Sequence, residues 1–196
     1  MIVITSEIIL LFLVTLLNLH NSYLIYTLLP LLFLFYFNRY IHSDKPDKKY
    51  IFSPAFGYIG DIKQEKSNTR VSIILGLHDI HVQYAPIESR LLSQKYHKGK
   101  FIPVFSVEKT NDNEKLTCSY KSYNDIHFQV EQIAGTIART IINFNNIGSY
   151  IKQGQLLGMI KLGSRVDLIF PTHNMDLLKK TGDKIEGGKP LALFIE

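Results

Sequence analysis

Cysteine is nearly absent from this chain. Cys118 is the single cysteine among 196 residues. One thiol cannot form an intrachain disulfide, and it cannot supply the thiolates of a multi-cysteine zinc site. The sequence therefore predicts no disulfide and no metal site, and Cys118 is expected to be an ordinary structural residue.

Positive charge is absent from the first part of the chain. No Lys or Arg precedes Arg39, and Glu7 is the only acidic residue there, so this first segment has a net charge of −1. Because the whole chain has a net charge of +5, the remainder carries +6. A basic surface next to an apolar segment favours contact with anionic lipid headgroups over an ordinary basic globular surface. No stretch combines aromatic residues with Arg as nucleic-acid-binding proteins do, so no nucleic-acid partner is expected.

Residues 1–38 are predicted to form a membrane anchor. Two apolar runs, Ile8–Leu17 and Tyr23–Phe37, fill most of this segment. Each run is shorter than the roughly 20 residues that a membrane-spanning helix needs, so a tight helical hairpin competes with one long helix bent at residues 20–22. A signal peptide is disfavoured, because a basic n-region and a small-residue cleavage site are both missing. We expect a membrane helix or helical hairpin.

Aromatic and basic residues follow the apolar runs. In the stretch Phe35–Tyr40, Arg39 lies among aromatic residues, a pattern typical of the membrane–water interface. Because all basic residues follow the anchor, the positive-inside rule predicts a membrane-anchored protein with its soluble domain on the cytoplasmic side. Residues 39–50 are polar, contain Pro46 and are predicted to be a linker.

Residues 51–196 are predicted to form a mainly β domain of the α+β class. Short apolar runs separated by turn residues suit strands, and Ile126, Phe128 and Val130 alternate with polar residues as in a half-buried strand. The segment Ile133–Ile142 suits a helix or a strand equally. The expected strands are Val71–Leu75, Ile80–Tyr84, Phe101–Val107, Ile126–Val130, Val166–Phe170 and Leu191–Ile195.

An internal repeat indicates a barrel-like fold. Gly148–Leu157 and Gly182–Leu191 both read Gly-x-x-Ile-x-x-Gly-x-x-Leu, in which the glycines permit tight turns. The repeat resembles the half-motifs of biotinyl and lipoyl carrier domains. It raises a carrier function as an alternative, with Lys161 as the modified residue. The sequence Leu-Gly-Ser after Lys161 does not match the Met or Ala that flank such lysines, so this alternative ranks low.

Four spaced motifs carry a resemblance to a known family. They are Asp79-Ile80-His81, Tyr96–Phe101, Gln132–Arg139 and Gly163-Ser164. In this order, over about residues 30 to 196, they resemble the phosphatidylserine decarboxylase family, in particular its short membrane-anchored type. The resemblance implies self-cleavage between Gly163 and Ser164, which converts Ser164 into a pyruvoyl group. It also implies decarboxylation of phosphatidylserine to phosphatidylethanolamine and CO2, since the pyruvoyl ketone serves as an electron sink.

The resemblance places histidines near the cleavage site. His81 is implied to hold the substrate carboxylate or to transfer protons, against the alternative of a half-exposed strand residue. His78 and Asp79 are candidates beside it, and Asp79 either orients an imidazole or closes a turn.

Other motif residues are implied to bind the substrate. Asn113, Glu114 and Arg139 match family positions, and Arg139 suits a phosphate or carboxylate. Alternatively, Arg139 pairs with Glu114 or Glu131. The partners implied are a phospholipid membrane and phosphatidylserine, and a homo-oligomer is compatible with the resemblance.

Two positions depart from the family pattern. Where the family reads Ser-Pro-Ala-Asp-Gly, this chain has Phe56 in place of Asp, and Tyr84 occupies the position of a histidine found in the longer enzymes. Because positioned general bases contribute about 10²- to 10⁴-fold, another group would have to activate the serine. Asp61, His78 and His81 are the candidates. If none of them acts, the chain is a non-cleaving homologue that binds lipid or a partner.

Overall fold

A computed structural model describes most of the chain, namely residues 6–17, 24–104, 107–136, 140–161 and 163–195. The chain divides into two compact units, Met1–Ile41 and His42–Glu196. The predicted linker begins at residue 39, whereas the second unit begins at His42.

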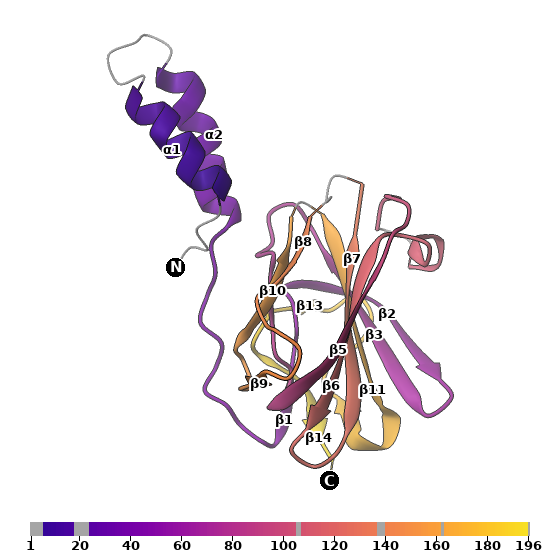
Figure 1. Cartoon of the computed structure of the whole chain (residues 1–196). Coiled ribbons are helices and arrows are strands. Elements are labelled where there is room, and N and C mark those ends of the chain that lie inside the picture. The colour runs from indigo at the N-terminus through magenta and orange to yellow at the C-terminus, as the bar shows by residue number, and fades with distance from the viewer. Residues whose placement is uncertain (1–5, 18–23, 105–106, 137–139, 162, 196) are drawn as a thin grey trace. The chain divides into compact units, whose positions relative to one another are not determined.

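The first unit contains two helices, α1 (Ser6–Leu17) and α2 (Leu24–Phe37), which pack against each other (Figure 1). Ile8 and Leu31 are buried, whereas most of the large apolar side chains are exposed. Within the described residues, no helix is long and apolar enough to cross a membrane.

The second unit is mainly β, as the sequence predicts, with antiparallel strands in three sheets and two short 3-10 turns, η1 (Glu108–Thr110) and η2 (Thr172–Asn174). The strands are β1 (Tyr50–Phe52), β2 (Gly57–Glu65), β3 (Asn68–Leu75), β4 (Val82–Tyr84), β5 (Ser89–His97), β6 (Lys115–Ser122), β7 (His127–Ala134), β8 (Ile141–Asn143), β9 (Tyr150–Ile151), β10 (Leu156–Ile160), β11 (Ser164–Pro171), β12 (Met175–Leu177), β13 (Lys184–Ile185) and β14 (Pro190–Phe194).

The largest sheet curls into a half-barrel around the core (Figure 1). Its eight strands run in the order β13-β2-β3-β11-β7-β6-β5-β9, and two three-stranded sheets, β4-β10-β8 and β1-β14-β12, complete the unit. Strand β11 is therefore paired on both sides, with β3 and with β7. The sequence near residue 164 thus lies in the middle of the largest sheet.

Side-chain alternation gives β11 an inner and an outer face. Val166, Leu168 and Phe170 belong to the buried apolar core. Because successive strand residues point to opposite faces, Ser164 shares the inner face with them, and Arg165 and Asp167 lie on the outer face.

The two halves of the internal repeat have the same backbone conformation. Gly148 and Gly182 have φ of +91° and +92°, and Gly154 and Gly188 have φ of +75° and +74°. Glycine is the residue that takes these values at little cost. Each repeat consists of a short strand, a glycine turn and a longer strand, and its Ile and Leu are buried.

Part of the predicted linker is attached to both repeats. A Cβ built at Gly154 would lie 2.1 Å from Ser43 Oγ, and one built at Gly188 would lie 2.6 Å from Ser43 Cβ. The backbone N–H of Asp47 donates to Gln153 Oε1 at 2.7 Å. The segment from Ser43 onward is therefore a packed part of the second unit.

One predicted strand is wrong. Of the segment Phe101–Val107, the described residues form irregular backbone and a turn. The reason is that Asn113 satisfies the backbone of Ile102, accepting its N–H at 3.1 Å and donating to its carbonyl at 2.7 Å, in place of a strand partner. In the ambiguous segment Ile133–Ile142, the described residues include the end of β7 and the start of β8, so strand was the better alternative there.

Candidate functional site

Ser164 is the first residue of β11 and has a buried hydroxyl. Its backbone pairs with Leu75 of β3 and Ala134 of β7, and the residue is 0% exposed. Among the described residues, its Oγ has no hydrogen-bond partner. Because buried polar atoms are nearly always hydrogen-bonded, an unpartnered buried hydroxyl points to a chemical role.

Gly163, the residue before it, has a backbone conformation that favours glycine, with φ of +70°. Its carbonyl lies directly against Gly135, since a Cβ built at Gly135 would be 2.3 Å from the Gly163 oxygen. The Ile-Ala-Gly motif therefore ends in a glycine that makes room for the carbonyl carbon which Ser164 would attack.

The His81 imidazole is hydrogen-bonded to Gly163. His81 is 0% exposed and comes directly before β4. Its Nδ1 lies 2.8 Å from the Asp79 carbonyl, which can only accept, so Nδ1 carries the ring hydrogen. Its Nε2 then bears a lone pair and accepts the Gly163 N–H at 3.2 Å. The structure thus brings His81 to the residue beside Ser164 in the tautomer that can take up a proton at Nε2.

Asp79 closes a turn with its side chain and orients the imidazole with its backbone. Its carboxylate accepts the Gly76 N–H at 2.8 Å, and its own N–H donates to the Gly76 carbonyl at 3.1 Å. Both alternatives considered for Asp79 are thus present, through different atoms. His78 and Leu77 lie on the exposed part of the same turn.

Two buried glutamines tether His81 from behind. Gln132 is the first residue of the motif Gln132–Arg139, but no role was predicted for it, and Gln83 was not predicted at all. Gln83 donates to the His81 carbonyl at 2.7 Å, and Gln132 donates to Gln83 Oε1 at 2.7 Å. Gln83 belongs to β4 and Gln132 to β7, so this chain of hydrogen bonds joins two sheets across the core. The sequence signal for Gln83 was a polar residue in the apolar run after His81, and the signal for Gln132 was its place in the motif Gln132–Arg139.

Asn113 connects the Tyr96–Phe101 motif to the strand beside Ser164. Its side-chain amide donates to the carbonyls of Ile102 and Ala134 at 2.7 and 2.8 Å. Ala134 is the residue that pairs with Ser164. The described contacts of this amide are all with backbone, and they fix the end of β7.

Glu114 and Tyr96 form an exposed pair. The Tyr96 hydroxyl donates to Glu114 Oε1, and this carboxylate raises the pKa of Tyr96. Gly99 packs against the backbone of residues 112–114, since a Cβ there would lie 2.3 Å from the Asp112 carbonyl oxygen. The Tyr-x-x-Gly-x-Phe motif and the Asn-Glu motif therefore pack together as one element.

Arg139 lies outside the described residues. Its two alternative partners have contacts of their own. Glu131 accepts from Arg70 at 2.8 Å and from Thr117 at 2.9 Å, and Glu114 is bound to Tyr96.

The two positions that depart from the family pattern touch each other. The rings of Phe56 and Tyr84 meet edge to face with centroids 5.9 Å apart. A Cβ at Gly187 would lie 2.8 Å from either ring, so this glycine makes room for the pair. An apolar contact therefore occupies the two positions at which the family resemblance implies a carboxylate and, in the longer enzymes, a histidine.

The three candidate bases occupy different places. Asp61 of β2 pairs with Ser72 of β3, which pairs with Asp167 of β11. Asp167 lies three residues, or about 10 Å, along β11 from Ser164, and Asp61 lies two strands across the sheet from β11. It lines a cleft on the outer face, whereas Ser164 faces inward. His78 is exposed. Of the three, His81 is the one with a hydrogen bond to Gly163.

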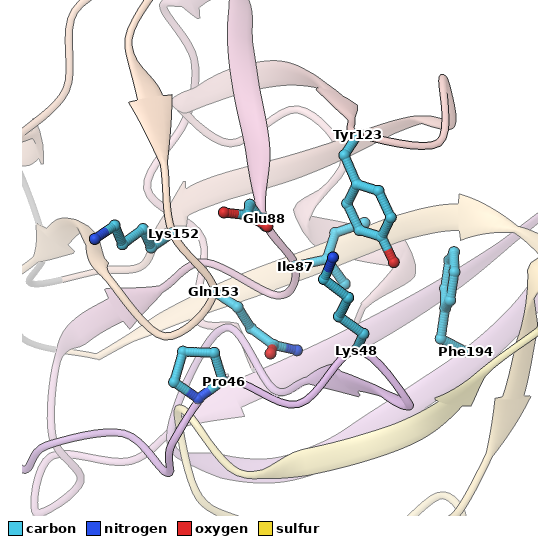
Figure 2. A pocket seen from close by; sticks show the side chains of 8 residues that line it. All are labelled: Pro46, Lys48, Ile87, Glu88, Tyr123, Lys152, Gln153 and Phe194. Carbon is cyan, nitrogen blue, oxygen red and sulfur yellow. The ribbon is translucent and has the colours of Figure 1, made fainter.

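A separate hollow of about 150 Å³ lies far from this site. Figure 2 shows its lining, with the Lys48 ammonium 4.5 Å from the centroid of the Tyr123 ring and Phe194 nearby. Tyr123 precedes β7, whose opposite end carries Ala134, the partner of Ser164, so roughly 20 Å of strand separate the two places. The hollow is no part of the Gly163–Ser164 site.

Comparison with known proteins agrees with the convergence of the motifs. The sequence model described as phosphatidylserine decarboxylase matches residues 40–193. A Methanosarcina barkeri protein named as an archaetidylserine decarboxylase proenzyme is 35% identical over 147 residues, covering 75% of this chain and 69% of the relative. The phosphatidylserine decarboxylase proenzymes of Carboxydothermus hydrogenoformans and Amoebophilus asiaticus are 34% and 32% identical, covering 82% and 84% of this chain and 78% and 76% of the relatives.

Proposed function

Because the chain belongs to the phosphatidylserine decarboxylase family of carboxy-lyases, we propose that it converts phosphatidylserine to phosphatidylethanolamine and CO2. The observation that carries the proposal is the site itself: a buried Ser164 hydroxyl without a described partner, preceded by Gly163, whose carbonyl lies against Gly135 and whose N–H donates to His81. A second serine phospholipid, archaetidylserine, is named for one set of relatives, and the serine headgroup is the chemistry that both lipids share.

The catalytic group is proposed to arise by cleavage of the chain. Ser164 Oγ attacks the Gly163 carbonyl carbon, the peptide bond breaks, and an ester joins the two residues. Loss of the Ser164 α-proton then expels the Gly163 carboxylate, and water replaces the nitrogen at position 164, releasing ammonia. The new ketone would accept the electron pair that decarboxylation leaves on the substrate.

His81 is proposed to serve as the base in place of the missing carboxylate. Its Nε2 lone pair faces the Gly163–Ser164 segment, and its Nδ1 hydrogen is held by the Asp79 carbonyl, which fixes the ring orientation. The hydrogen bond from the Gly163 N–H to Nε2 would have to break before Nε2 could take the Ser164 proton. Phe56, which replaces that carboxylate, has no group that could take up a proton. The alternative of a non-cleaving homologue rests on the Phe56–Tyr84 pair alone, and no comparison supports it.

The N-terminal unit is proposed to hold the protein at a membrane, with the second unit on the cytoplasmic side. Large apolar side chains on both helices are exposed, among them Phe12, Leu17 and Leu29. Such surfaces favour contact with lipid over water. Arg39 lies 3.8 Å from the centroid of the Tyr36 ring, an arrangement that suits headgroup depth. Deletion of residues 1–38 should move the protein from floated vesicles to the soluble fraction.

The proposal is tested by mass and by product. Purified wild-type protein should appear as two chains, the smaller beginning at position 164 with a pyruvoyl group, and Ser164→Ala should remain one chain. Detergent-solubilised wild type should then release CO2 from phosphatidylserine, with an archaetidylserine arm to compare the two lipids. A single full-length wild-type chain would overturn the proposal, and a lipoyl or biotinyl mass on Lys161 would indicate a carrier instead.

A further inference from the structure

Arg165, the residue after Ser164, has a buried guanidinium that the proposed chemistry does not use. The residue is 1% exposed. Its Nη1 donates to the Val107 carbonyl at 2.7 Å and to the Thr110 hydroxyl. Its Nη2 donates to Asp167 Oδ2 at 3.1 Å, and its Nε lies 2.9 Å from Asp167 Oδ1, outside hydrogen-bond geometry.

A buried arginine at this position is unusual on energetic grounds. Taking a charge out of water is unfavourable unless good pairing compensates for it, and apolar residues of similar volume often replace such pairs without loss of stability. The burial of the Arg165 guanidinium is therefore better explained by a specific task at this place than by a contribution to stability.

The charge of Arg165 is balanced by an ionic cluster on the outer face of the sheet. Asp167 lies between Arg165 and Arg70, whose Nη1 is 3.0 Å from Asp167 Oδ2 and 2.8 Å from Glu131 Oε2. Lys115 Nζ is 3.5 Å from Glu131 Oε1. The carboxylates thus hold both guanidinium groups, but the described contacts of Arg70 do not extend to Val107 or Thr110.

Arg165 joins two elements that border the cleavage site. Val107 and Thr110 belong to the turn at η1, and Val104, earlier in the same connection, is the nearest side chain to a Cβ at Gly135 after the Gly163 carbonyl itself. The guanidinium therefore links the start of β11 to the connection that covers Gly135.

We propose that Arg165 is a positioning residue that keeps residue 164 in place after the bond before it has been cut. The inference rests on the proposed function. Before cleavage, the chain holds residue 164 from both sides, but afterwards residue 164 is a chain end, and chain ends fray unless they are tied down. Arg165, the second residue of the new chain, is tied to Asp167, Val107 and Thr110. Its anchor keeps the new ketone at a fixed distance from His81.

The test separates cleavage from turnover. Arg165→Met should still be cut, as read by intact mass, but its kcat should fall about tenfold with little change in KM, because a misplacement of about 1 Å can cost up to about 100-fold. The ketone at position 164 should also react faster with a hydrazine reagent, since a frayed end is more accessible. Arg70→Met is the matched control: it removes a guanidinium from the same cluster and should leave kcat and the hydrazine rate unchanged.

A second pair of variants covers the outcome that Arg165→Met does not fold. Thr110→Val removes the hydroxyl that Arg165 contacts and should lower kcat a few-fold, whereas Thr110→Ser keeps the hydroxyl and should behave as wild type. If Arg165→Met and Thr110→Val are cut and turn over as wild type does, the inference is wrong while the proposed function stands. If wild type itself is uncut, the mass measurement shows it first, and both fail.

Discussion

At the scale of single residues, the Gly163–Ser164 site depends on two glycines, Gly135 and Gly163. Gly163 has a φ of +70°, and the Gly163 carbonyl leaves no space for a side chain at Gly135. These two glycines let the Gly163 backbone combine a close approach of its carbonyl to Gly135 with a hydrogen bond from its N–H to His81. Each position requires glycine for a different geometric reason, so the two can be tested by separate substitutions.

Gly135→Ala should slow the cleavage. The added Cβ would lie 2.3 Å from the Gly163 oxygen, and because this opposing atom belongs to the backbone, the Gly163 carbonyl must shift away from its place beside Ser164. We expect at least a tenfold slower appearance of the two chains in a time course of freshly made protein. Thr136→Ala, at the exposed neighbouring position, should cleave at the wild-type rate. Equal rates for all three proteins would show that the carbonyl position is unimportant.

Cys118 should be chemically silent in the folded protein. Burial raises the pKa of its thiol, and the residue is 2% exposed, so little thiolate is available to react. A thiol reagent such as Ellman's reagent should label native protein very slowly and should label one thiol per chain in denaturant. Rapid labelling of the native protein would mean that β6 opens locally.

Residues differ in how far the sequence could identify them. Gly163, Ser164 and His81 could be found, because spaced motifs carry them whatever the order of the strands. The roles of Gln132, which also belongs to a motif, and of Arg165 could not be predicted, because they depend on which strand lies beside which and on which face each side chain takes. Alternation along β7 and β11 reveals the faces only once the pairing is known. The segment Phe101–Val107 failed for a related reason: its apolar residues suit a strand, but Asn113 supplies its hydrogen bonds.

At the scale of elements, a hydrogen-bonded connection between two sheets holds His81, the proposed base. β4 carries Gln83 and β7 carries Gln132, and their hydrogen bond at 2.7 Å is buried between the sheets. Amides in such a position constrain the two sheets to one relative placement, because each polar atom needs its partner. Gln83 in turn donates to the His81 carbonyl at 2.7 Å and so holds the backbone at His81.

Gln132→Leu should therefore weaken both folding and cleavage. Gln83 Oε1 would lose the donor from Gln132, and leaving a buried group unpaired costs about 1–3 kcal/mol. Urea denaturation should show a loss of this size, and cleavage should slow because the His81 carbonyl loses its firm support. Gln129→Leu on the same strand, which removes only a 3.3 Å contact with Ser119, is the control and should have a smaller effect on both. A cleavage rate unchanged by Gln132→Leu would remove the glutamines from the site.

At the scale of the whole molecule, ionic contacts on the outer face of the half-barrel make stability depend on pH. Burial raises the pKa of Glu131, but the positive charges of Lys115 and Arg70 lower it by more, so that its pKa lies below the ordinary value of 4.5. A carboxylate whose pKa is lowered by folding stabilises the folded state above its unfolded pKa. That contribution is lost as the pH falls through the lower, folded value.

The free energy of unfolding should accordingly decrease as the pH falls from about 5 towards 3. Glu131→Gln should be less stable at pH 7 and should show a shallower decrease over this range, because one of the titrating groups has been removed. Denaturation curves at a series of pH values measure both effects. An equally steep decrease in the variant would assign the pH dependence to other carboxylates.

The central position of β11 has a consequence for how the cut protein can refold after denaturation. Under the proposed cleavage, residues 164–196 become a separate polypeptide whose β11 pairs with β3 and β7, whose β13 pairs with β2 and whose β14 pairs with β1. Every one of these ladders then joins two molecules. The uncut precursor folds by a first-order process, whereas the cut protein, once denatured, can recover only through a bimolecular encounter whose yield depends on concentration. Cleavage would thus leave the mature protein with a fold that it reached as a single chain and that it could not regain by the same first-order reaction.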